Sequence, residues 1–389
     1  MRLTRRGAGL LATGPTLLAA GFGFGYPELA VLGCAALVAV VLAVLHALWR
    51  PVLAVTRRAD PDRVMRGDDS RMTLTVHNNS RLLAATLVAY DRCGAAVVPV
   101  PVLRLRPGHD TVAEYPVPTD RRGVVAIGPL RVVRRDPLGL ATAARASGDV
   151  AQVWVYPTVH RLSAVPVGVV RSLDGRVDRV PHGTITFDTL REYVVGDELR
   201  HVHWRTSARI GELMVREHLD TSLPRLVVLL DDRLCAHPGG RDGTADSFEA
   251  ACEAAASLVV AAHREELPLV LQAVSGDVVA RDGRRSDTRA YLDLLAEARL
   301  RGTGDGDDLD RAVARLRHRR AGDTLIYLTG PGDAADLGTV GSLRGLYPTI
   351  VVGTLGNTTG APSTMDGITV LSAGDGAGFA AEWDGVRAW

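Results

Sequence analysis

The pattern of hydrophobic and polar positions divides the chain into stretches with different periods. At the N-terminal end two long apolar runs follow each other, residues 7–27 and 29–49, and neither carries a charge apart from the weakly basic His46. Each run has 21 residues, and about 20 are needed to cross the core of a bilayer as a helix. The pattern therefore predicts a two-helix membrane hairpin within residues 1–50, in contact with the lipid bilayer through residues 7–49.

Arginines stand at the outer ends of both apolar runs and not between them. Glu28 is the charged residue of the short connection, whereas arginines precede the first run and follow the second, at Arg2, Arg5, Arg6, Arg50, Arg57 and Arg58. Cytoplasmic flanks are rich in Lys and Arg, so this distribution predicts a multi-pass protein of the cell membrane with both termini in the cytoplasm. Two alternatives remain. The first run is a cleaved signal segment, or it does not span and leaves the rest of the chain outside.

Residues 51–157 change to a period of two, which is typical of strands with one buried face. In MTLTVHN, at 72–78, Met72, Leu74 and Val76 alternate with polar positions. Prolines in the later strand-like runs indicate edge strands or bulges, since Pro cannot donate to a ladder; they are Pro99, Pro101, Pro116 and Pro118. Short strands at this spacing predict an all-β, sandwich-like domain. Its isolated polar residues fall in turns, so we expect a spacer or binding module.

Residues 223–389 alternate strand and helix patterns. RLVVLLD, at 225–231, is a continuous apolar run of the kind that is buried on both faces of a parallel sheet. An Ala-rich helix pattern opens at Asp246, and the alternation continues to the C-terminal end. This predicts a Rossmann-like α/β domain with a mostly parallel sheet and helices on both faces. Ligands of such sheets bind at the carboxyl ends of strands, here the tips after Asp231, Gln272–Gly276, Thr329 and Thr354.

Composition excludes several classes of function. The net charge is +1 and the chain contains no Lys, so no basic field recruits nucleic acid and no phosphate-binding G-x-x-x-x-G-K-[ST] loop is present. The acidic, glycine-rich GTGDGDD at 302–308 lacks the spacing of a calcium loop, and we interpret it as a solvated entry to a helix. The cysteines form no C-x-x-C pair, which argues against a disulfide framework and favours a reducing compartment; they are Cys34, Cys93, Cys235 and Cys252.

The densest cluster of charge is REYVVGDELRHVHWRTSARIGELMVRE, residues 191–217, inside a predicted linker at 158–222. Three interpretations of it are open. As an enzyme, the segment would use His201 and His203, which share a face if they lie on a strand, in a metal site. The pattern shows no third ligand for such a site, and no base for Ser207.

The other two interpretations place no chemistry in residues 191–217. In a structural seam, acids and arginines of the segment pair with each other and Trp204 covers them. The pairing residues would be Glu192, Asp197 and Glu198 with Arg191, Arg200 and Arg205. In a docking surface, Trp204 and the arginines face a partner, because Arg and Trp are enriched at interface hot spots. The residues that form the seam or the docking surface are Glu192, Tyr193, Gly196, Asp197, Arg200, Trp204, Ser207, Arg209, Arg216 and Glu217.

Several elements, taken in chain order, resemble one bacterial family. RRGVVAIGPL at 121–130, DPLGL at 136–140 and VYP at 155–157 precede Phe187 and the 191–217 signature, in which E-Y, G-D, an Arg, a Trp, S-A-R and L-x-V-R-E recur. Over roughly residues 30–330 the chain resembles the family called domain of unknown function 58. The resemblance implies a membrane-anchored protein with a C-terminal von Willebrand factor A-like domain. It also implies a MoxR-type AAA+ ATPase as partner, a chaperone-like or assembly role and no enzymatic activity.

The resemblance also points to one candidate metal site. It implies a divalent cation held by D-x-S-x-S at the end of the first strand, with a later Thr and Asp. In LLDDRLCAH, Asp231 takes the first position, but Arg233 and Cys235 take the Ser positions. A guanidinium repels a cation and a thiol is a poor ligand for a hard one, so we expect a degenerate site with no metal and no cofactor. Arg233 is instead expected to pair with Asp231 or Asp232 and to replace the charge of the cation.

The later strand departs from the family pattern as well, because Thr329 and Gly330 stand where its Asp is expected and Asp333 is displaced. Together these features predict a membrane-anchored, cytoplasm-facing scaffold or adaptor that mediates protein–protein interaction. The alternative is a metal-dependent hydrolase or transferase that uses the region of His201 and His203. The sequence leaves the client, the pathway and the oligomeric state open.

Overall fold

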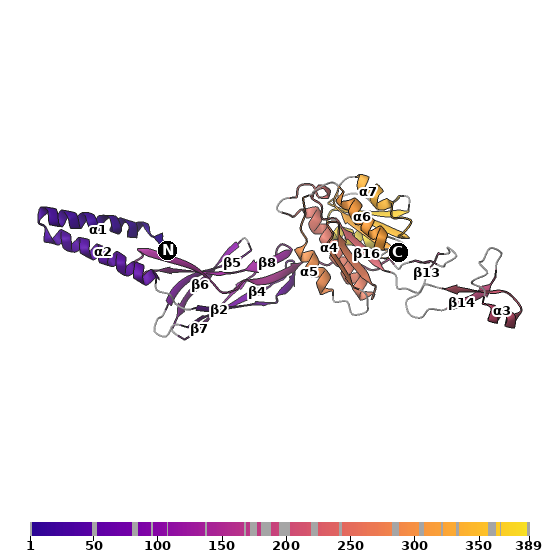
Figure 1. The fold of residues 1–389 in the computed structure, drawn as a ribbon, viewed down its shortest axis with the longest axis horizontal. Coiled ribbons are helices and arrows are strands. Elements are labelled where there is room, and N and C mark those ends of the chain that lie inside the picture. The colour runs from indigo at the N-terminus through magenta and orange to yellow at the C-terminus, as the bar shows by residue number, and fades with distance from the viewer. Residues whose placement is uncertain are drawn as a thin grey trace. The chain divides into compact units, whose positions relative to one another are not determined.

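The fold is that of a computed structural model, which divides into two compact units, Met1–Tyr156 and Pro157–Trp389. Each unit is described by itself (Figure 1). The residues that the structure describes are 2–48, 53–79, 85–94, 96–106, 108–136, 138–166, 169–171, 177–179, 188–193, 203–218, 225–240, 243–281, 288–302, 307–319, 322–331, 334–356, 363–365 and 367–386.

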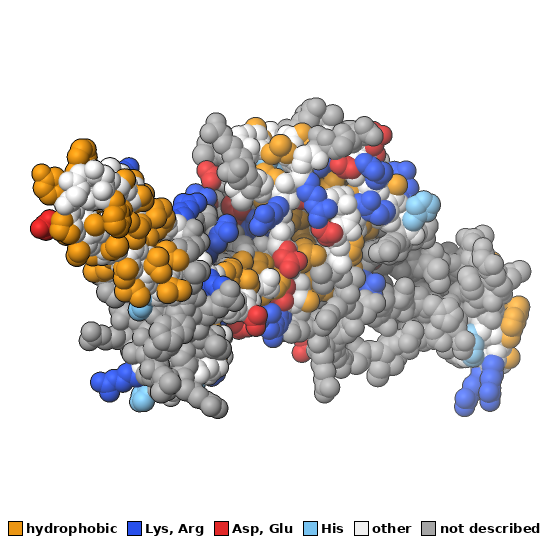
Figure 2. Space-filling view, turned by 60° about the vertical axis from the view of Figure 1, so that its left-hand side comes forward, with side chains coloured by type: hydrophobic (Ala, Val, Ile, Leu, Met, Phe, Trp, Pro, Cys, Tyr) orange, Lys and Arg blue, Asp and Glu red, His pale blue; other side chains and the backbone are white. Residues whose placement is uncertain are grey.

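The predicted apolar hairpin is confirmed as two helices, α1 (Arg5–Phe24) and α2 (Pro27–Leu48). Gly25 makes the turn between them with φ +74°, a conformation that suits Gly because it has no Cβ. Both helices are long and apolar enough to cross a membrane. Large apolar side chains remain exposed along them, as Figure 2 shows; they include Phe22, Phe24, Val31, Leu32, Val38, Val41, Leu42 and Leu45.

Small residues let the two helices approach closely. Gly7, Gly14 and Gly21 are the buried positions of α1, and they recur every seven residues. A Cβ added at Gly21 would lie 2.5 Å from the amide nitrogen of Ala30 in α2, so only Gly fits this crossing. Such small-residue contacts are typical of helix pairs in membranes, where van der Waals packing replaces the hydrophobic effect.

The rest of unit 1 consists of strands. They are β1 (Arg2–Leu3), β2 (Leu53–Asp60), β3 (Arg63–Met65), β4 (Arg71–Asn78), β5 (Ala85–Cys93), β6 (Ala96–Leu105), β7 (Asp110–Pro116), β8 (Gly123–Ile127), β9 (Leu130–Arg135), β10 (Ala141–Ser147) and β11 (Ala151–Tyr156). An eight-stranded sheet has the order β1-β10-β9-β5-β8-β11-β3 with β6 beside β5, and β2-β4-β7 form a second sheet.

The alternation predicted for residues 72–78 is confirmed in β4, where Met72, Leu74 and Val76 are buried. These side chains share one core with residues of the larger sheet, among them Ile127 and Val153. The edge strands predicted from proline are confirmed too. Among the described strands, β6, which carries Pro99 and Pro101, pairs with β5 alone, and β7, which ends at Pro116, pairs with β4 alone.

Unit 2 carries the predicted alternation of strands and helices. Its sheet strands are β16 (Leu226–Leu230), β17 (Leu269–Ala273), β18 (Val278–Arg281), β19 (Thr324–Thr329), β20 (Thr349–Leu355), β21 (Ser363–Met365) and β22 (Ile368–Ala373). Its helices beside the sheet are α4 (Asp246–Arg264), α5 (Arg289–Glu297), α6 (Asp308–Arg319), α7 (Ala334–Gly341) and α8 (Gly376–Gly385). Two short pairs, β12 (Val169–Arg171) with β13 (Val177–Arg179) and β14 (Asp188–Glu192) with β15 (Met214–His218), and helix α3 (Trp204–Ile210) complete it.

The sheet of unit 2 is mostly parallel, as predicted. Its order is β18-β17-β16-β19-β20-β22-β21; the five central strands are parallel and β18 and β21 join antiparallel at the edges. Helices cover both faces (Figure 1). One core places Leu229 and Tyr327 against Val313 of α6 and Val340 of α7, while α4 packs over the other face.

Residues 157–166, which the sequence assigns mostly to a linker, pack along α4 and α8. The indole Nε1 of Trp383 donates to the carbonyl of Ala164 at 2.7 Å, and Arg264 Nη2 donates to the carbonyl of Leu162 at 2.8 Å. Ser163 adds two hydrogen bonds to the carboxylate of Asp384. This segment is therefore part of the α/β unit and joins its first and last long helices.

Candidate functional site

The candidate site lies at the carboxyl end of β16. The chain runs from β16 through α4 to β17 on one side of it, and later returns to β19 on the other side. Ligands of open α/β sheets bind at such a reversal of strand order. Asp231 follows β16 directly and Thr329 ends β19, so both stand at this position. The sequence predicted ligand positions after both strands, and in the structure these two positions lie together.

Arg233 and Asp231 form a buried ion pair at the end of β16. Arg233 Nε donates to Oδ1 of Asp231 at 2.9 Å, and Nη2 donates to Oδ2 at 2.8 Å. The Asp231 side chain is fully buried and that of Arg233 nearly so. The prediction that Arg233 pairs with a neighbouring Asp is confirmed for Asp231.

Three further donors complete the surroundings of the Asp231 carboxylate. The amide of Arg233 donates to Oδ1 at 3.1 Å, the hydroxyl of Tyr327 to Oδ2 at 2.6 Å and the hydroxyl of Thr329 to Oδ2 at 2.9 Å. A carboxylate has about four lone-pair sites, and these donors together with the guanidinium occupy them. No acceptor capacity of Asp231 is left for a cation.

The opposite side of the guanidinium contacts Asp336 in α7. Arg233 Nη2 lies 2.6 Å from Oδ2 of Asp336, so one arginine bridges two carboxylates. Burial opposes the charge of Asp231, but the hydrogen bonds and charge of Arg233 outweigh it and lower the pKa of this carboxyl. Burial and the charge of Asp231 raise the pKa of Tyr327 well above its ordinary value, so its hydroxyl stays protonated as a donor. The centre is an ionised and fully bonded cluster.

The turn after the ion pair is fixed by His237, which is fully buried. Its Nε2 lies 2.9 Å from the carbonyl oxygen of Asp231, and because a carbonyl only accepts, this nitrogen carries the proton. Nδ1 then accepts from the hydroxyl of Ser247 at 2.9 Å. Burial lowers the pKa of His237, so the ring is neutral. A Cβ at Gly330 would lie 2.1 Å from the carbonyl oxygen of Ala236. The chain after β19 can therefore approach this turn closely only with Gly at position 330.

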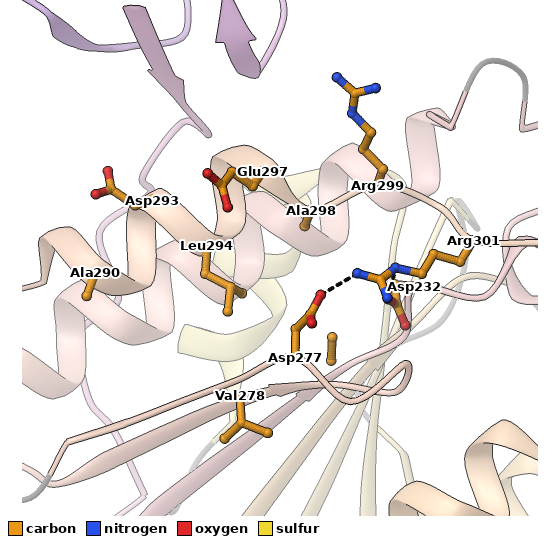
Figure 3. Close-up of a pocket in the computed structure, with 11 residues that line it drawn as sticks. Asp232, Asp277, Val278, Ala290, Asp293, Leu294, Glu297, Ala298, Arg299 and Arg301 are labelled. Carbon is orange, nitrogen blue, oxygen red and sulfur yellow. Dashed lines mark hydrogen bonds and ion pairs between the residues drawn. The ribbon is translucent and has the colours of Figure 1, made fainter. Parts of the chain in front are cut away.

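Asp232, the residue after Asp231, lines a cavity of about 570 Å³ beside α5 (Figure 3). One of its carboxylate oxygens accepts the amide of Ser275 at 2.9 Å. Burial raises its pKa. Arg301 binds the carboxylate of Asp277 and approaches Asp232 to 3.9 Å. The lining residues are Asp232, Ala273, Asp277, Val278, Ala290, Asp293, Leu294, Glu297, Ala298, Arg299 and Arg301.

The lining of the cavity contains more acidic residues than arginines, together with aliphatic side chains. Asp293 and Glu297 stand one turn apart on α5, and Figure 3 shows them on the same helix above Val278. Side chains three or four apart on a helix are neighbours. This arrangement suits a cationic side chain with an aliphatic stem, such as Arg or Lys, better than an anion.

Within the described part of the chain, no group of three or more His, Cys, Asp or Glu side chains is placed to hold a metal ion. Cys235, which takes a Ser position of the D-x-S-x-S pattern, lies in a short 3-10 turn, Leu234–Ala236, and is exposed. That Asp231, Arg233 and Cys235 bind no metal stays a prediction. The hydrogen bonds of Asp231 give its physical reason, because they occupy the carboxylate oxygens.

The charged signature forms a small strand–helix–strand element. β14 pairs antiparallel with β15, and the amide of Tyr193 donates to the carbonyl of Leu213 at 2.8 Å. Glu192 ends β14, while Arg216 and Glu217 lie in β15 opposite Leu190 and Thr189. Gly196, Asp197, Glu198, Arg200 and His201 lie outside the described residues.

Two polar side chains of the signature have structural roles. The hydroxyl of Ser207 accepts the amide of Met214 at 2.8 Å and donates to the carbonyl of His203, which fastens α3 to β15. Nδ1 of His203 accepts the amide of Thr206 and caps the start of α3. Of the other residues that the seam and docking interpretations place on this helix, Trp204 shows 62% of its surface and Arg209 is also exposed, whereas Ser207 is buried.

Sequence reasoning missed three residues of the Asp231 centre: Tyr327, Asp336 and His237. Tyr327 lies inside an apolar strand pattern, which predicts that it is buried but not that it binds Asp231. Asp336 stands in the first turn of α7. It lies three residues beyond Asp333, the displaced Asp of the family pattern, which is outside the described residues. His237 gives the best signal, since it follows the LLDDRLCA stretch within one short turn.

Comparison with known proteins gives one family. Residues 189–329 match the family described as DUF58, protein of unknown function. This confirms the resemblance for residues 189–329, the part of the chain that holds most of the 191–217 signature. No curated protein matches the chain.

Three solved structures show weak likeness. A CARDB domain from Pyrococcus furiosus, in complex with di-metal ions, is 15% identical with a TM-score of 0.21, over 27% of this chain and 86% of that one. A β-glucosidase from Erythrobacter marinus is 16% identical with a TM-score of 0.17, over 25% of this chain and 15% of that one. Cwp6 from Clostridium difficile is 10% identical with a TM-score of 0.20, over 85% of this chain and 56% of that one.

Proposed function

We propose that this chain, whose residues 189–329 belong to the DUF58 family, is a membrane-anchored scaffold that binds another protein and catalyses no reaction. We also propose that unit 1 is a β sandwich on a membrane hairpin and that unit 2 is a von Willebrand A-like domain without its metal. The partner that fits best is a MoxR-type AAA+ ATPase, in a chaperone-like or assembly role.

The observation that carries the proposal is the bonding of Asp231. This carboxylate stands at the reversal of strand order, where α/β domains bind ligands, yet five hydrogen bonds from the protein fill it. A general base needs a free lone pair within reach of substrate, and a metal ligand needs one toward the cation. Asp231 has neither, so the centre supports a fixed shape and not a reaction.

Membrane anchoring is supported by the hairpin. Helices α1 and α2 expose apolar side chains along their length and carry no acid beyond Glu28 in the first turn of α2. The arginines that flank them favour cytoplasmic ends. In this orientation both units face the cytoplasm, where a soluble AAA+ ATPase is accessible.

The surface proposed for the partner is α3. Trp204 and Leu213 are exposed apolar side chains, and Arg205 and Arg209 stand beside them on the same short element. Exposed Trp next to Arg is the combination enriched at interface hot spots. The charge of this surface favours an acidic patch on the partner.

The test is retention of a purified MoxR-type ATPase by the full chain in detergent or nanodiscs. We expect binding by the wild-type chain and a loss of about thirtyfold or more for Trp204→Ala and for Arg209→Glu, since hot-spot truncations cost about 2 kcal/mol or more. Arg311→Glu, at an exposed arginine of α6, is the matched control and should bind normally.

Two results would contradict the proposal. If Trp204→Ala is degraded or melts early, the charged segment is a seam of the fold and not a docking surface. If the purified protein contains zinc or manganese at one atom per chain, the metal-dependent hydrolase or transferase becomes the better function.

A further inference from the structure

The loop after β9 is held rigidly by one buried carboxylate. Asp136 Oδ1 accepts the amide of Ala141 at 2.6 Å, and Oδ2 accepts the amide of Leu138 at 2.9 Å. The amide of Gly139 donates back to the carbonyl of Asp136 at 3.0 Å. With its backbone fixed in this way, the loop points Leu138 outward, and 60% of that side chain is exposed.

The same loop is joined to the base of the membrane hairpin. The hydroxyl of Thr4 donates to the carbonyl of Gly139 at 2.7 Å, and the amide of Thr4 donates to the carbonyl of Leu140 at 2.9 Å. A Cβ at Gly7, in the first turns of α1, would lie 2.2 Å from the carbonyl oxygen of Leu140. Leu140 itself is buried with Val40 and Ala43 of α2.

These contacts set the depth of the loop. Leu140 is level with Gly7, and the first large lipid-exposed side chain of α1, Leu11, stands four residues further on. At 1.5 Å per residue this separation is about 6 Å along the helix axis. The headgroup region on each side of a bilayer is about as thick. When α1 spans, the loop therefore lies close to the level at which α1 enters the bilayer.

The surroundings of Leu138 match the headgroup region. Leu3 of β1 is also exposed and apolar, and three exposed arginines flank it, at Arg2, Arg5 and Arg6. We define Leu3, Leu138 and these arginines as the collar. Apolar side chains next to cationic ones suit the boundary between acyl chains and phosphate groups.

We propose that the collar is a second lipid contact, in which Leu138 inserts into the membrane–water interface and fixes unit 1 against the bilayer. The inference rests on the proposed spanning hairpin and adds to it a contact made by the β-strand region. Hydrogen bonds already fix the backbone at Leu138, so insertion orders little more of the chain, which favours binding.

The test is spin-label accessibility in the full chain, reconstituted in vesicles of phosphatidylcholine and phosphatidylglycerol. Exposed Cys34 and Cys235 are first replaced by Ala, while buried Cys93 and Cys252 are retained. Labels are placed at Leu138→Cys, at Val112→Cys on β7 and at Val38→Cys in α2, whose parent side chains are 60%, 57% and 56% exposed. Collision with oxygen reports lipid, and collision with a water-soluble nickel chelate reports solvent.

We expect the oxygen-to-nickel ratio at position 138 to be several-fold above that at 112 and below that at 38. Equal ratios at 138 and 112, with 38 in lipid, would overturn the lipid contact and leave the spanning hairpin intact. A label at 38 that behaves as in water would overturn the spanning hairpin and the collar together. Leu138 is exposed, so its replacement does not disturb a core.

Discussion

The guanidinium of Arg233 holds the carboxylate of Asp231 through two parallel hydrogen bonds, at 2.9 and 2.8 Å, at the reversal point of a parallel sheet. In the family that the sequence resembles, a divalent cation is expected at this place. Here the positive charge is part of the chain, and Asp336 from α7 binds its other side. Two strands and a helix are thus joined through one side chain.

Removing the guanidinium should destabilise unit 2. In Arg233→Ala, Asp231 remains buried without its counter-charge, and breaking a buried pair from one side costs about 3–5 kcal/mol. We expect the melting temperature of unit 2 to fall on the order of 10 °C, measured by scanning fluorimetry of the full chain in detergent. Arg311→Ala is the control. Its pair with Asp308 lies at the surface of α6, and such pairs contribute under about 1 kcal/mol. Equal shifts for both variants would contradict the role of Arg233.

Divalent cations should bind only after Arg233 is removed. The wild-type chain is expected to show no calorimetric signal with Mg²⁺ or Mn²⁺ at this centre, because Asp231 has no free acceptor. Arg233→Ser removes the two guanidinium hydrogen bonds to Asp231 and the cation bound to Asp336, and we expect it to bind Mn²⁺. Asp231→Asn in the same background should abolish that binding. Micromolar binding by the wild type would contradict the saturated centre.

Acid should destabilise unit 2 through His237. Burial lowers its pKa from 6.5, so the unfolded state takes up a proton below about pH 6.5 that the folded ring does not accept. Stability should therefore fall as pH drops from 7 to 5, by up to about 1.4 kcal/mol per pH unit. Urea midpoints of wild type and His237→Gln isolate this group from the other histidines. Asp231, whose pKa is lowered from 3.8, acts only at more acidic pH.

If His237→Gln keeps the full pH slope, the proton uptake belongs to another residue. The variant retains an N–H that can donate to the carbonyl of Asp231, so its stability at pH 7 should be close to that of the wild type.

The two sheets of unit 1 are joined by a buried cluster around Asp91. Arg57 of β2 donates to Asp91 of β5 at 3.1 and 3.3 Å, and the hydroxyl of Tyr115 of β7 donates at 2.7 Å. Tyr115→Phe should cost about 2 kcal/mol, since a bond to a charged group is lost. Val112→Ala, at an exposed position of the same strand, should change stability by less than about 0.5 kcal/mol.

Cys93 offers a local readout for that cluster. It is buried, and burial, with Asp91 nearby, raises its pKa to about 11, so it reacts with iodoacetamide only when unit 1 opens. We expect alkylation of Cys93 to be about thirtyfold faster in Tyr115→Phe. An unchanged rate in that variant would mean that the tyrosine hydroxyl contributes nothing to stability.

Topology can be tested by reporter fusions. A green fluorescent protein after Trp389 should fluoresce and an alkaline phosphatase there should be inactive, whereas a phosphatase inserted between Gly25 and Tyr26 should be active. The arginine flanks favour this outcome. The reverse pattern would place both units outside the cytoplasm.

The sequence predicted most elements because their burial patterns are local. In MTLTVHN and RLVVLLD a few residues are enough to show which positions are buried, and both strands are confirmed. The Ala-rich ATAARAS gave no such signal, so β10 was missed, although it pairs with β1 and β9. Alanine is a weak strand former, so pairing with β9 and β1, and not the pattern of residues 141–147, makes this segment a strand.

The Asp231 centre was predicted only in part for a related reason. Asp231 and Arg233 are two residues apart, and their pairing follows from local chemistry. Asp336 is 103 residues from Arg233, and Tyr327 is 96 from Asp231. The parallel register of β16 and β19 brings Tyr327 to Asp231, and helix α7, which follows β19, brings Asp336 to Arg233. A Tyr in an apolar strand pattern gives no indication in the sequence that its hydroxyl will donate to a distant carboxylate.

The pairing of β1 with β10 has a consequence for biogenesis. Arg2 and Thr142 are separated by 140 residues, with both apolar helices between them. At ordinary rates of synthesis Arg2 leaves the ribosome on the order of ten seconds before its partner exists. The pair closes only if both ends of the hairpin lie on the same side of the bilayer. If α1 and α2 span the membrane as proposed, a chain whose two hairpin ends lie on opposite sides would lack β1 in its larger sheet.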